Sequence, residues 1–257
     1  MGLVSLHDRV ALERWLRRDA RVHLYELGDL DDFFWPHTTW YGLEESADLR
    51  AVALLYAASD LAVLIALGGG ARELVARLAP VLPRRFYAHL EVGAASALGP
   101  AFAVSPRGLH DRMVLTRPSE LDEVDTHEAV TLAASHASEL ESFYASAYPG
   151  NWFDRRMLET GGYRAVQRDG RIVSVAGVHV LSRKYRVAAL GNVATNAAFR
   201  GRGLGRIVCA ALCKDLMALA DPVGLNVLSS NAAAIALYQQ LGFVRVAHYE
   251  EAMVEAR

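Results

Sequence analysis

One segment of the chain combines glycines and arginines in a way that suits an anion. It is Arg200-Gly201-Arg202-Gly203-Leu204-Gly205-Arg206, and apolar residues at helical spacing follow it. Glycine lets the backbone turn with positive φ and brings N–H groups close to a ligand. A helix that begins there leaves its first four N–H groups unpaired and carries about half a positive charge at that end. The segment therefore predicts a phosphate or pyrophosphate site.

The spacing of the arginines and glycines excludes two common phosphate-binding motifs but does not identify the ligand. Arg202 and Arg206 are four residues apart, so we expect them on one side of the helix. The spacing is not the dinucleotide fingerprint G-x-G-x-x-G, because counting from Gly201 places Arg206 at the last glycine. The Gly-Lys-Ser/Thr ending of a P-loop is also missing. A glycine-rich turn with solvated arginines and a nucleotide-phosphate site of another kind remain alternatives.

A second motif lies one predicted strand further on, and the pair resembles the GNAT superfamily of acyl-CoA-dependent N-acyltransferases. That family's loop, Gln/Arg-x-x-Gly-x-Gly/Ala, is matched by Arg200, Gly203 and Gly205. Its later signature, Asn-x-x-Ala-x-x-Leu-Tyr-x-x-Leu-Gly-Phe, is matched by Asn231, Ala234, Leu237, Tyr238, Leu241, Gly242 and Phe243. The resemblance covers about residues 127–254, and the first half of the chain lacks both motifs.

The resemblance implies an enzyme, an N-acyltransferase and most simply an N-acetyltransferase, with acetyl-CoA or another acyl-CoA as cosubstrate and no metal. It implies that backbone groups of Val193, Ala194 and Thr195 pair with the pantetheine arm. The pyrophosphate would be held by N–H groups of Gly201, Arg202, Gly203, Leu204, Gly205 and Arg206, together with Arg200. Asn231 would bond the pantetheine, and Tyr238 would be the general acid for the departing thiolate. Simpler roles are a helix cap for Asn231 and packing for Tyr238.

The general base is the point at which this chain departs from the family pattern. Many relatives place a glutamate on the strand before the loop, but residues 186–195 contain no carboxylate, and Ala189 stands about where it would be. The candidates are His179 on the adjacent strand, Asp154, Glu159 or bulk water, whereas we expect His136, near a helix start, to be structural. A histidine that only packs is the alternative for His179.

The missing base bears on the acceptor, which we expect to be a small-molecule or peptide amine. At pH 7, only about one part in a thousand of an amine with a pKa near 10.4 is neutral. For an α-amine with a pKa near 8, the free-energy cost of forming the neutral amine is only about 1–1.5 kcal/mol. A low-pKa amine is therefore mildly favoured. The acceptor pocket is predicted from a group of aromatic residues, for which ordinary core packing is the alternative: Tyr144, Tyr148, Trp152, Phe153, Phe33, Phe34 and Trp35.

The elements that would position these residues can be predicted from patterning. In the second half they are a helix over 134–144, a turn at 148–151, a short helix over 152–159, strands over 163–167 and 172–180 joined by Asp169-Gly170, a strand over 186–195, a helix from about 204 to 219, a strand over 225–228, a helix from Asn231 to Leu241 and a strand over 243–253. In the first half they are a helix over 1–19, strands over 51–57 and 61–67 around a Ser59-Asp60 turn, helices over 71–79 and 92–98, and strands over 85–90 and 111–116.

These elements predict an α/β (α+β) fold built from two GNAT-like mixed-sheet halves in tandem, with helices on both faces. Residues 1–122 would form a degenerate N-terminal domain, and residues 127–257 the acyl-CoA-binding catalytic domain. By the resemblance, the central strands of the C-terminal half would splay.

Composition restricts the class of protein further. The chain has 257 residues, a net charge of −2 and 53% hydrophobic residues, which predicts a globular protein without a field that attracts nucleic acid or anionic lipid. No apolar run predicts a membrane span, and no N-terminal signal is recognised. The two cysteines, Cys209 and Cys213, do not form a disulfide framework, which fits the cytoplasm. We expect a monomer or homodimer. A catalytically silent acyl-CoA sensor or scaffold remains the rival to an enzyme.

Overall fold

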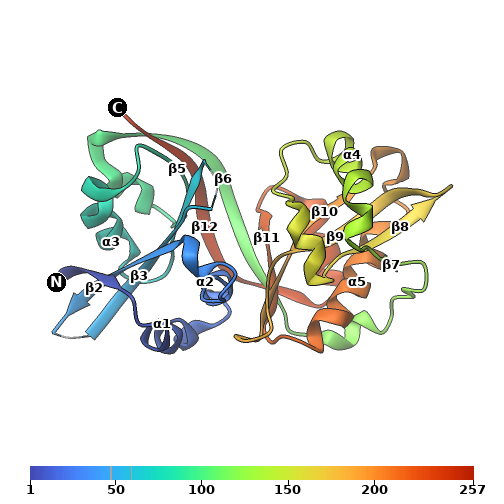
Figure 1. Ribbon diagram of the computed structural model, residues 1–257, viewed down its shortest axis with the longest axis horizontal. Coiled ribbons are helices and arrows are strands. Elements are labelled where there is room, and N and C mark those ends of the chain that lie inside the picture. Colours follow the sequence, from blue (N-terminus) through green and yellow to red (C-terminus); the bar gives the residue numbers. More distant parts are fainter. Residues whose placement is uncertain (47, 59) are drawn as a thin grey trace. The chain divides into compact units, whose positions relative to one another are not determined.

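The computed structural model describes residues 1–46, 48–58 and 60–257, and it divides into two compact units. Unit 1 consists of Met1–Arg112, Val227–Ser230 and Arg245–Arg257, and unit 2 consists of Met113–Asn226 and Asn231–Val244. Strand β6 (Phe102–Leu115) begins in unit 1 and ends in unit 2, whereas β12 (Phe243–Ala256) runs from unit 2 into unit 1 (Figure 1). The contacts thus group residues 245–257 with unit 1, unlike the predicted boundary at 122–127. The separate roles predicted for the two halves stay predictions.

Unit 1 is built around a mixed sheet. Its strand order is β1-β2-β3-β4-β5-β12-β6, with β4 and β5 parallel. The strands confined to this unit are β1 (Gly2–Leu6), β2 (Thr38–Glu45), β3 (Asp48–Tyr56), β4 (Ala62–Ala66) and β5 (Arg85–Glu91). The helices are α1 (Arg9–Leu16), α2 (Leu24–Asp29) and α3 (Ala71–Leu78), with 3₁₀ turns at Arg17–Asp19, Trp35–His37, Ala79–Val81 and Ala94–Ala101.

The two faces of the unit 1 sheet differ in character, because successive residues of a strand point to opposite sides. On β5, Phe86, Ala88 and Leu90 are buried in one apolar cluster with residues of α3. Tyr87 and His89 lie between them in sequence and therefore face the other way.

A carboxylate is surrounded by polar groups on that second face. Glu251 of β12 accepts hydrogen bonds from the hydroxyls of Tyr87, at 2.5 Å, and Tyr249, at 2.8 Å. The Nε2 atoms of His89 and His110 each lie 3.5 Å from its oxygens. Burial lowers the pKa of His89 to about 4, although the Glu251 charge opposes that shift.

The strands of unit 2 are also mixed in direction, because β10 and β11 are parallel whereas the other neighbouring strands of this unit are antiparallel. Its own strands, in the order β11-β10-β9-β8-β7, are β7 (Val130–Thr131), β8 (Arg164–Arg168), β9 (Arg171–Ser182), β10 (Val187–Thr195) and β11 (Val223–Leu228). The helices are α4 (Ala137–Ala147), α5 (Leu204–Met217) and α6 (Ala232–Gln240), with 3₁₀ turns at Pro118–Leu121, Ala134–His136, Arg155–Thr160 and Ala197–Phe199.

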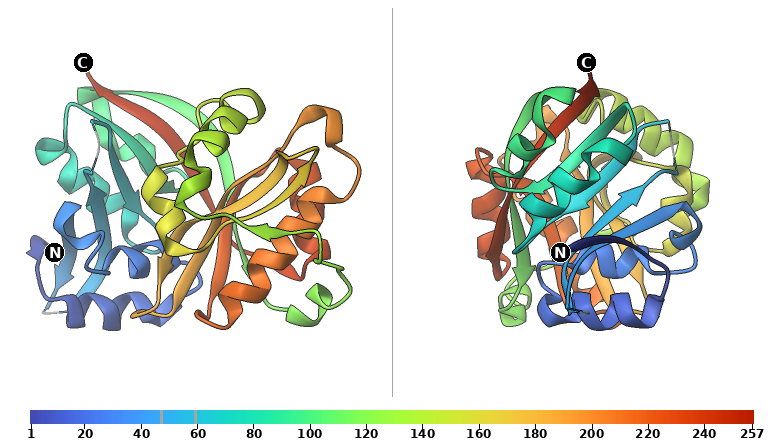
Figure 2. Two further views of the ribbon diagram at one scale, coloured as in Figure 1. Left: turned by 45° about the vertical axis from the view of Figure 1, so that its right-hand side comes forward. Right: turned by 90° about the vertical axis from the view of Figure 1, so that its left-hand side faces the viewer.

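Helices cover both faces of the unit 2 sheet, as predicted (Figure 2). Arg164 of β8 forms an ion pair with Asp215 of α5, with 2.6 Å between Nε and Oδ2. Tyr163, the preceding residue, packs on Phe153, which in turn packs on Tyr144 of α4. Since Tyr163 and Arg164 point to opposite sides, α4 and α5 lie on opposite faces of the sheet.

The best predicted local feature is the turn between β8 and β9. Asp169 and Gly170 both have positive φ, 50° and 72°, as the tight turn of a two-residue hairpin requires. The helix from Leu204, the strand over β11 and the helix from Asn231 are likewise confirmed.

The predicted helix over residues 1–19 is wrong in its first half. Gly2–Leu6 is a strand, β1, that pairs antiparallel with β2, and the helix α1 begins only at Arg9. Asp8 ends the extended segment, because its carboxylate caps α1 by accepting from the N–H groups of Val10, at 2.8 Å, and Ala11, at 3.1 Å. Val10, an apolar residue in the first turn of α1, is 64% exposed.

Three smaller predictions need correction. The helices expected over 92–98 and 152–159 are 3₁₀ turns at Ala94–Ala101 and Arg155–Thr160, and the strand expected over 111–116 begins at Phe102. The predicted turn at Ser59-Asp60 falls partly outside the described residues, because Ser59 is not among them.

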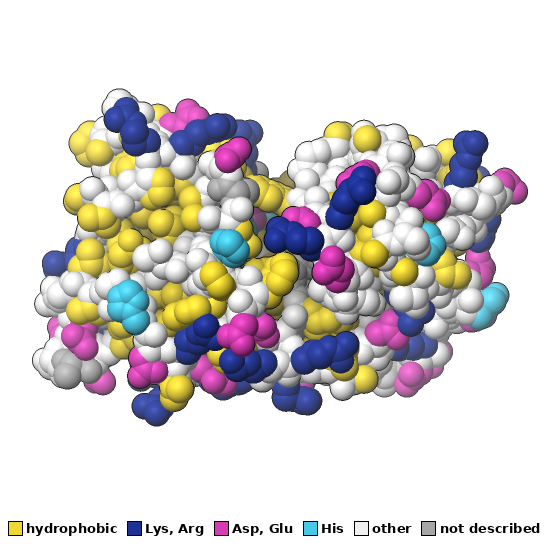
Figure 3. Space-filling model, viewed as in Figure 1, with side chains coloured by type: hydrophobic (Ala, Val, Ile, Leu, Met, Phe, Trp, Pro, Cys, Tyr) yellow, Lys and Arg dark blue, Asp and Glu magenta, His cyan; other side chains and the backbone are white. Residues whose placement is uncertain are grey.

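The surface carries charge of both signs. On the face seen in Figure 3, basic and acidic side chains are interspersed. Within the described ranges, no helix combines the length and the apolar character needed to cross a bilayer.

Candidate active site

The predicted anion loop lies between β10 and α5. After β10 ends at Thr195, a 3₁₀ turn leads to Gly201 and Gly203, whose φ angles are 74° and 75°. Both glycines occupy the left-handed region that other residues rarely adopt. Gly203 is the N-cap of α5, and none of the side chains that the structure describes caps that helix end. The first-turn N–H groups therefore have no acceptor within the helix, which leaves them available to an anion.

The three arginines of the loop have different surroundings. Arg200 Nε donates to the Thr195 carbonyl at 3.1 Å, and an Arg202 guanidinium nitrogen donates to the Ala198 carbonyl at 3.3 Å. Arg202 precedes the N-cap, so helical spacing does not relate it to Arg206 as predicted. The Nε atom of Arg206 is buried and has no hydrogen-bond partner among the described residues. Such an unpaired buried donor in the first turn of α5 fits a site for an anionic group.

The strands beside this loop separate, as predicted. Residues Ala188–Leu190 of β10 pair with Val223–Leu225 of β11, after which β10 continues to Thr195 and β11 to Leu228. The end of β10 lies close to α5 and α6. A Cβ placed on Gly205 would lie 3.2 Å from Leu237 Cδ1 and 3.6 Å from Thr195 Oγ1. Two predicted cofactor residues, Thr195 and Gly205, thus lie together at the start of α5, beside Leu237 of the α6 motif.

Asn231 and Tyr238 have the simpler structural roles, a helix cap and a packing contact, that the sequence left open as alternatives. Asn231 is the N-cap, and its Oδ1 accepts from the N–H of Ala234 at 3.2 Å. Tyr238 is 7% exposed and packs on Phe243, with 5.9 Å between ring centroids. Leu237, its neighbour, is the residue that contacts Gly205. The cofactor and acid roles of Asn231 and Tyr238 remain predictions.

A β-bulge interrupts β10 just before its end. The pairing with β9 shifts between Gly191 and Ala194, and Asn192, inside the bulge, has a φ of 53°. Bulges re-aim side chains and are frequent beside active sites. Here the bulge turns Asn192 into the sheet face covered by α4, because its carbonyl accepts from the hydroxyl of Tyr144 at 2.6 Å.

His179 lies next to this bulge. Its Nε2 is 3.2 Å from Asn192 Oδ1, and its ring lies over Gly191, where a Cβ would come within 2.3 Å of it. Gly177, the register partner of Gly191, makes room in the same way for Tyr163, whose ring would lie 2.1 Å from a Cβ. Sequence reasoning missed Asn192, Tyr163 and the two glycines. The available signal was an isolated glycine inside each of two apolar strands, which often marks a bulge or a close approach.

The other candidates for the base are less favourably placed. Asp154 caps a 3₁₀ turn and pairs with Arg156 at 2.7 Å, and this contact lowers the pKa of the carboxyl. Glu159 is exposed, and the Nδ1 of His136 accepts the N–H of Ala133 at 3.0 Å, which is a capping role. Ala189, where the family pattern suggested a glutamate, is fully buried.

Only some of the predicted acceptor residues come together. In unit 2, the rings of Tyr144 and Phe153 pack with centroids 5.3 Å apart, whereas Tyr148 and Trp152 are 45% and 51% exposed. Burial raises the pKa of Tyr144 and of Tyr163, so both hydroxyls stay protonated in the neutral range. Three predicted residues belong to unit 1, where they form aromatic contacts of their own: Phe33, Phe34 and Trp35.

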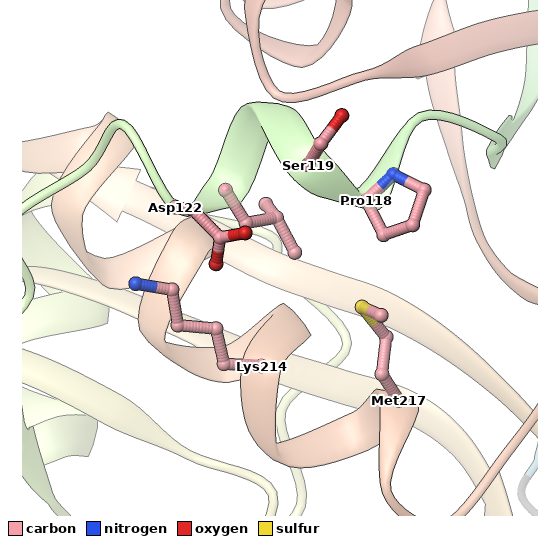
Figure 4. A pocket seen from close by; sticks show the side chains of 6 residues that line it. Pro118, Ser119, Asp122, Lys214 and Met217 are labelled. Carbon is pink, nitrogen blue, oxygen red and sulfur yellow. The ribbon is translucent and has the colours of Figure 1, made fainter.

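A surface pocket lies at the opposite end of α5 from the glycine loop. Its lining includes Pro118, Asp122, Lys214 and Met217 (Figure 4). The Lys214 ammonium donates to the Val124 carbonyl at 3.2 Å. None of the predicted site residues lines this pocket. Across the described ranges, no group of three or more His, Cys, Asp or Glu side chains could hold a metal ion.

Comparison with known proteins agrees with this geometry. Residues 129–243 match the model of the acetyltransferase (GNAT) family. A [ribosomal protein bS18]-alanine N-acetyltransferase of Salmonella typhimurium is 35% identical over 104 residues, which cover 38% of this chain and 67% of the relative.

Two solved structures match almost the whole chain. A Drosophila protein has a TM-score of 0.72 at 14% identity, with 98% of this chain and 97% of that one covered. A tandem GNAT protein from the clavulanic acid biosynthesis pathway has a TM-score of 0.56 at 16% identity and the same coverage. The loop at α5 and the α6 motif lie within the matched family region, and the chain belongs to the GNAT family of acetyltransferases.

Proposed function

We propose that this protein is an acyl-CoA-dependent N-acyltransferase, and most simply an N-acetyltransferase that uses acetyl-CoA. The observation that carries the proposal is the uncapped start of α5. Its glycines adopt positive φ, and the Nε of Arg206 is buried without a partner among the described residues. The start of this helix suits a pyrophosphate, and the gap between the two separating strands suits the extended pantetheine arm that follows it in coenzyme A.

The cosubstrate would be held mainly by backbone groups. N–H groups of residues 201–206 would bind the pyrophosphate, with the Arg206 side chain adding charge. The edge of β10 at Val193, Ala194 and Thr195, beyond its pairing with β11, would pair with the pantetheine amides, and the side chain of Asn231 would add a polar contact. No metal takes part. The bound thioester would supply an activated acyl carbon and a thiol leaving group.

The transfer is a direct attack by the amine nitrogen on the thioester carbon. A C–N bond forms and the C–S bond breaks. Tyr238 would give its hydroxyl proton to the departing sulfur, and His179 would take the proton that the nitrogen loses. Because His179 Nε2 faces Oδ1 of the Asn192 side chain, its Nδ1 is the nitrogen suited to accept that proton.

The acceptor we propose is a low-pKa amine, either the α-amine of a peptide or a small molecule. β10 offers no carboxylate to take a proton from a strongly basic amine. The name of the Salmonella relative, an alanine N-acetyltransferase, supports an α-amine, because alanine has no other. We place the protein in the cytoplasm as a monomer or homodimer, with Cys209 and Cys213 as free thiols.

A second candidate is a catalytically silent acyl-CoA sensor or scaffold, which the fully buried Ala189 favours. One experiment separates the two. The protein is incubated with acetyl-CoA and a panel of peptide α-amines, small α-amines and lysine-type amines, and released thiol is measured. The enzyme predicts release that is fastest with the α-amines. Tight binding of acetyl-CoA without release with any amine supports the sensor. Greater thermal stabilisation by ATP or NAD than by coenzyme A would refute both.

A further inference from the structure

We propose that Asn192 is a positioning residue, which holds the imidazole of His179 so that Nδ1 takes the proton lost by the acceptor amine. The inference rests on the proposed function for the reaction, but the hydrogen bond at its centre can be measured without any substrate. Its evidence is the conformation and the contacts of Asn192.

The backbone of Asn192 is held in an uncommon conformation. Its φ of 53° lies in the left-handed region, and the residue sits in the bulge of β10 and is 3% exposed. Asparagine tolerates this region better than most residues, but a positive φ outside glycine still costs about 1 kcal/mol or more. The hydroxyl of Tyr144 stabilises it by donating to the Asn192 carbonyl at 2.6 Å.

The side-chain amide has a fixed orientation. Its Nδ2 donates to the hydroxyl of Tyr163 at 3.0 Å and lies 3.6 Å from the Met157 sulfur, and both atoms can accept. Oδ1 therefore faces Nε2 of His179 at 3.2 Å. An amide oxygen only accepts, so Nε2 must carry the hydrogen, and neutral His179 has its lone pair on Nδ1.

The imidazole is also held by shape. Its ring occupies the space left by the missing side chain of Gly191, where a Cβ would lie 2.3 Å from Cδ2. Tyr163 fills the equivalent space over Gly177 and reaches Asn192 from there. Two paired glycines, a bulge and two buried tyrosines thus surround one partly exposed histidine.

The same contact serves the reaction after proton transfer. When Nδ1 gains the proton, both ring nitrogens carry hydrogen, and Nε2–H still donates to the Asn192 oxygen. The two tyrosines that contact Asn192, Tyr144 and Tyr163, are kept neutral by pKa values that burial raises and to which the charges of Tyr148 and Asp154 also contribute. The pair therefore gains a charge only on the imidazole.

The test uses three variants of the full-length protein. Asn192→Asp keeps an acceptor opposite Nε2 but adds a negative charge. Asn192→Gly accepts the positive φ and removes the amide. Tyr163→Phe keeps the ring over Gly177 and removes only the hydroxyl that orients the amide, so it remains informative should the other two fold poorly. Gln167→Glu is the matched control, because it adds the same charge to β8 opposite Ile172, seven residues along β9 from His179.

The first measurement is an NMR titration of the His179 imidazole without ligand, with its signal assigned by its loss in His179→Gln. We expect Asn192→Asp to raise the pKa of His179 by about 1–2 units, whereas Gln167→Glu should leave it within about 0.2 units of wild type. An unchanged pKa of His179 in Asn192→Asp would overturn the inference.

The second measurement is the pH profile of kcat/KM with acetyl-CoA and an α-amine. The acidic limb of Asn192→Asp should move to higher pH by the same amount as the NMR pKa. Asn192→Gly should lose about 10–100-fold in kcat with KM for acetyl-CoA changed less than about twofold, and Tyr163→Phe should lose less. If the NMR pKa of His179 shifts but the acidic limb of the kcat/KM profile does not, the proposed catalytic role of Asn192 and His179 is refuted. The proposal of acyl transfer is then unaffected. Wild-type protein that releases no thiol would refute the proposed function, and the titration would still decide on the hydrogen bond.

Discussion

The imidazole of His179 lies against the backbone of Gly191, and a Cβ at that glycine would come within 2.3 Å of the ring. Gly191 pairs in register with Gly177, over which Tyr163 lies in the same manner. The catalytic candidate and its neighbour therefore depend on two positions that carry no side chain. This arrangement makes the glycines a direct test of the site's packing.

Gly177→Ala should destabilise unit 2. The new methyl group would lie 2.1 Å from the ring of Tyr163, which is fully buried and cannot move aside without displacing Phe153. We expect a loss of about 1–3 kcal/mol in the free energy of unfolding, measured in urea. Gly69→Ala is the control, because nothing lies within 4 Å of a Cβ there and its φ is not positive. Equal stability of the two variants would contradict the packing described here.

Gly203→Asp should nearly abolish binding of coenzyme A. The carboxylate would stand at the N-cap of α5, where the phosphates are proposed to bind, and repulsion between like charges about 4–5 Å apart amounts to roughly 3–4 kcal/mol. We expect affinity, measured by calorimetry, to fall by two to three orders of magnitude. Gly203→Asn has nearly the same shape and tolerates positive φ, so it should lose far less. Equal losses in both variants would remove the electrostatic argument.

Tyr238→Phe should separate chemistry from binding. Its ring packs on Phe243 and would remain in place, while the hydroxyl proposed to protonate the leaving thiolate is lost. We expect kcat to fall by about 100-fold or more and the affinity for coenzyme A to change less than about twofold. Tyr41→Phe, in β2 of unit 1, serves as the control and should match wild type. An unaltered kcat in Tyr238→Phe would exclude the acid role.

His89 should make the stability of unit 1 depend on pH. Burial lowers the pKa of His89 to about 4, below its ordinary value of 6.5, so between these values the unfolded chain binds more protons than the folded one. The contribution is complete above about pH 6.5 and is lost as the pH falls toward 4, by up to about 3 kcal/mol. His89→Gln should reduce the difference between the free energies of unfolding measured at pH 7 and at pH 4.5. His7→Gln, at an exposed position, should not, and identical slopes in both variants would refute the assignment.

The sequence predicts those parts of the site that are determined by residues close together along the chain. The loop at Gly203 and the cap at Asn231 are readable because each depends on neighbouring residues, and the structure places both at helix starts. Asn192 could not be found in that way. Its role arises from the register of β9 and β10 and from Tyr163, 29 residues earlier. The failure at residues 1–19 has a similar cause, because β1 is extended through its pairing with β2 rather than through its own pattern.

The strand β12 also affects the order in which the protein can form during translation. Its residues Tyr249 to Glu255 pair with β5, and β12 lies between β5 and β6 in the sheet. Unit 2 ends at Val244, so all of it emerges from the ribosome before the residues of β12 that pair with β5. Domains commonly fold from the N-terminus as they emerge. Unit 1 therefore cannot complete its sheet until these residues of β12 have emerged, whereas every residue of unit 2 has emerged by then.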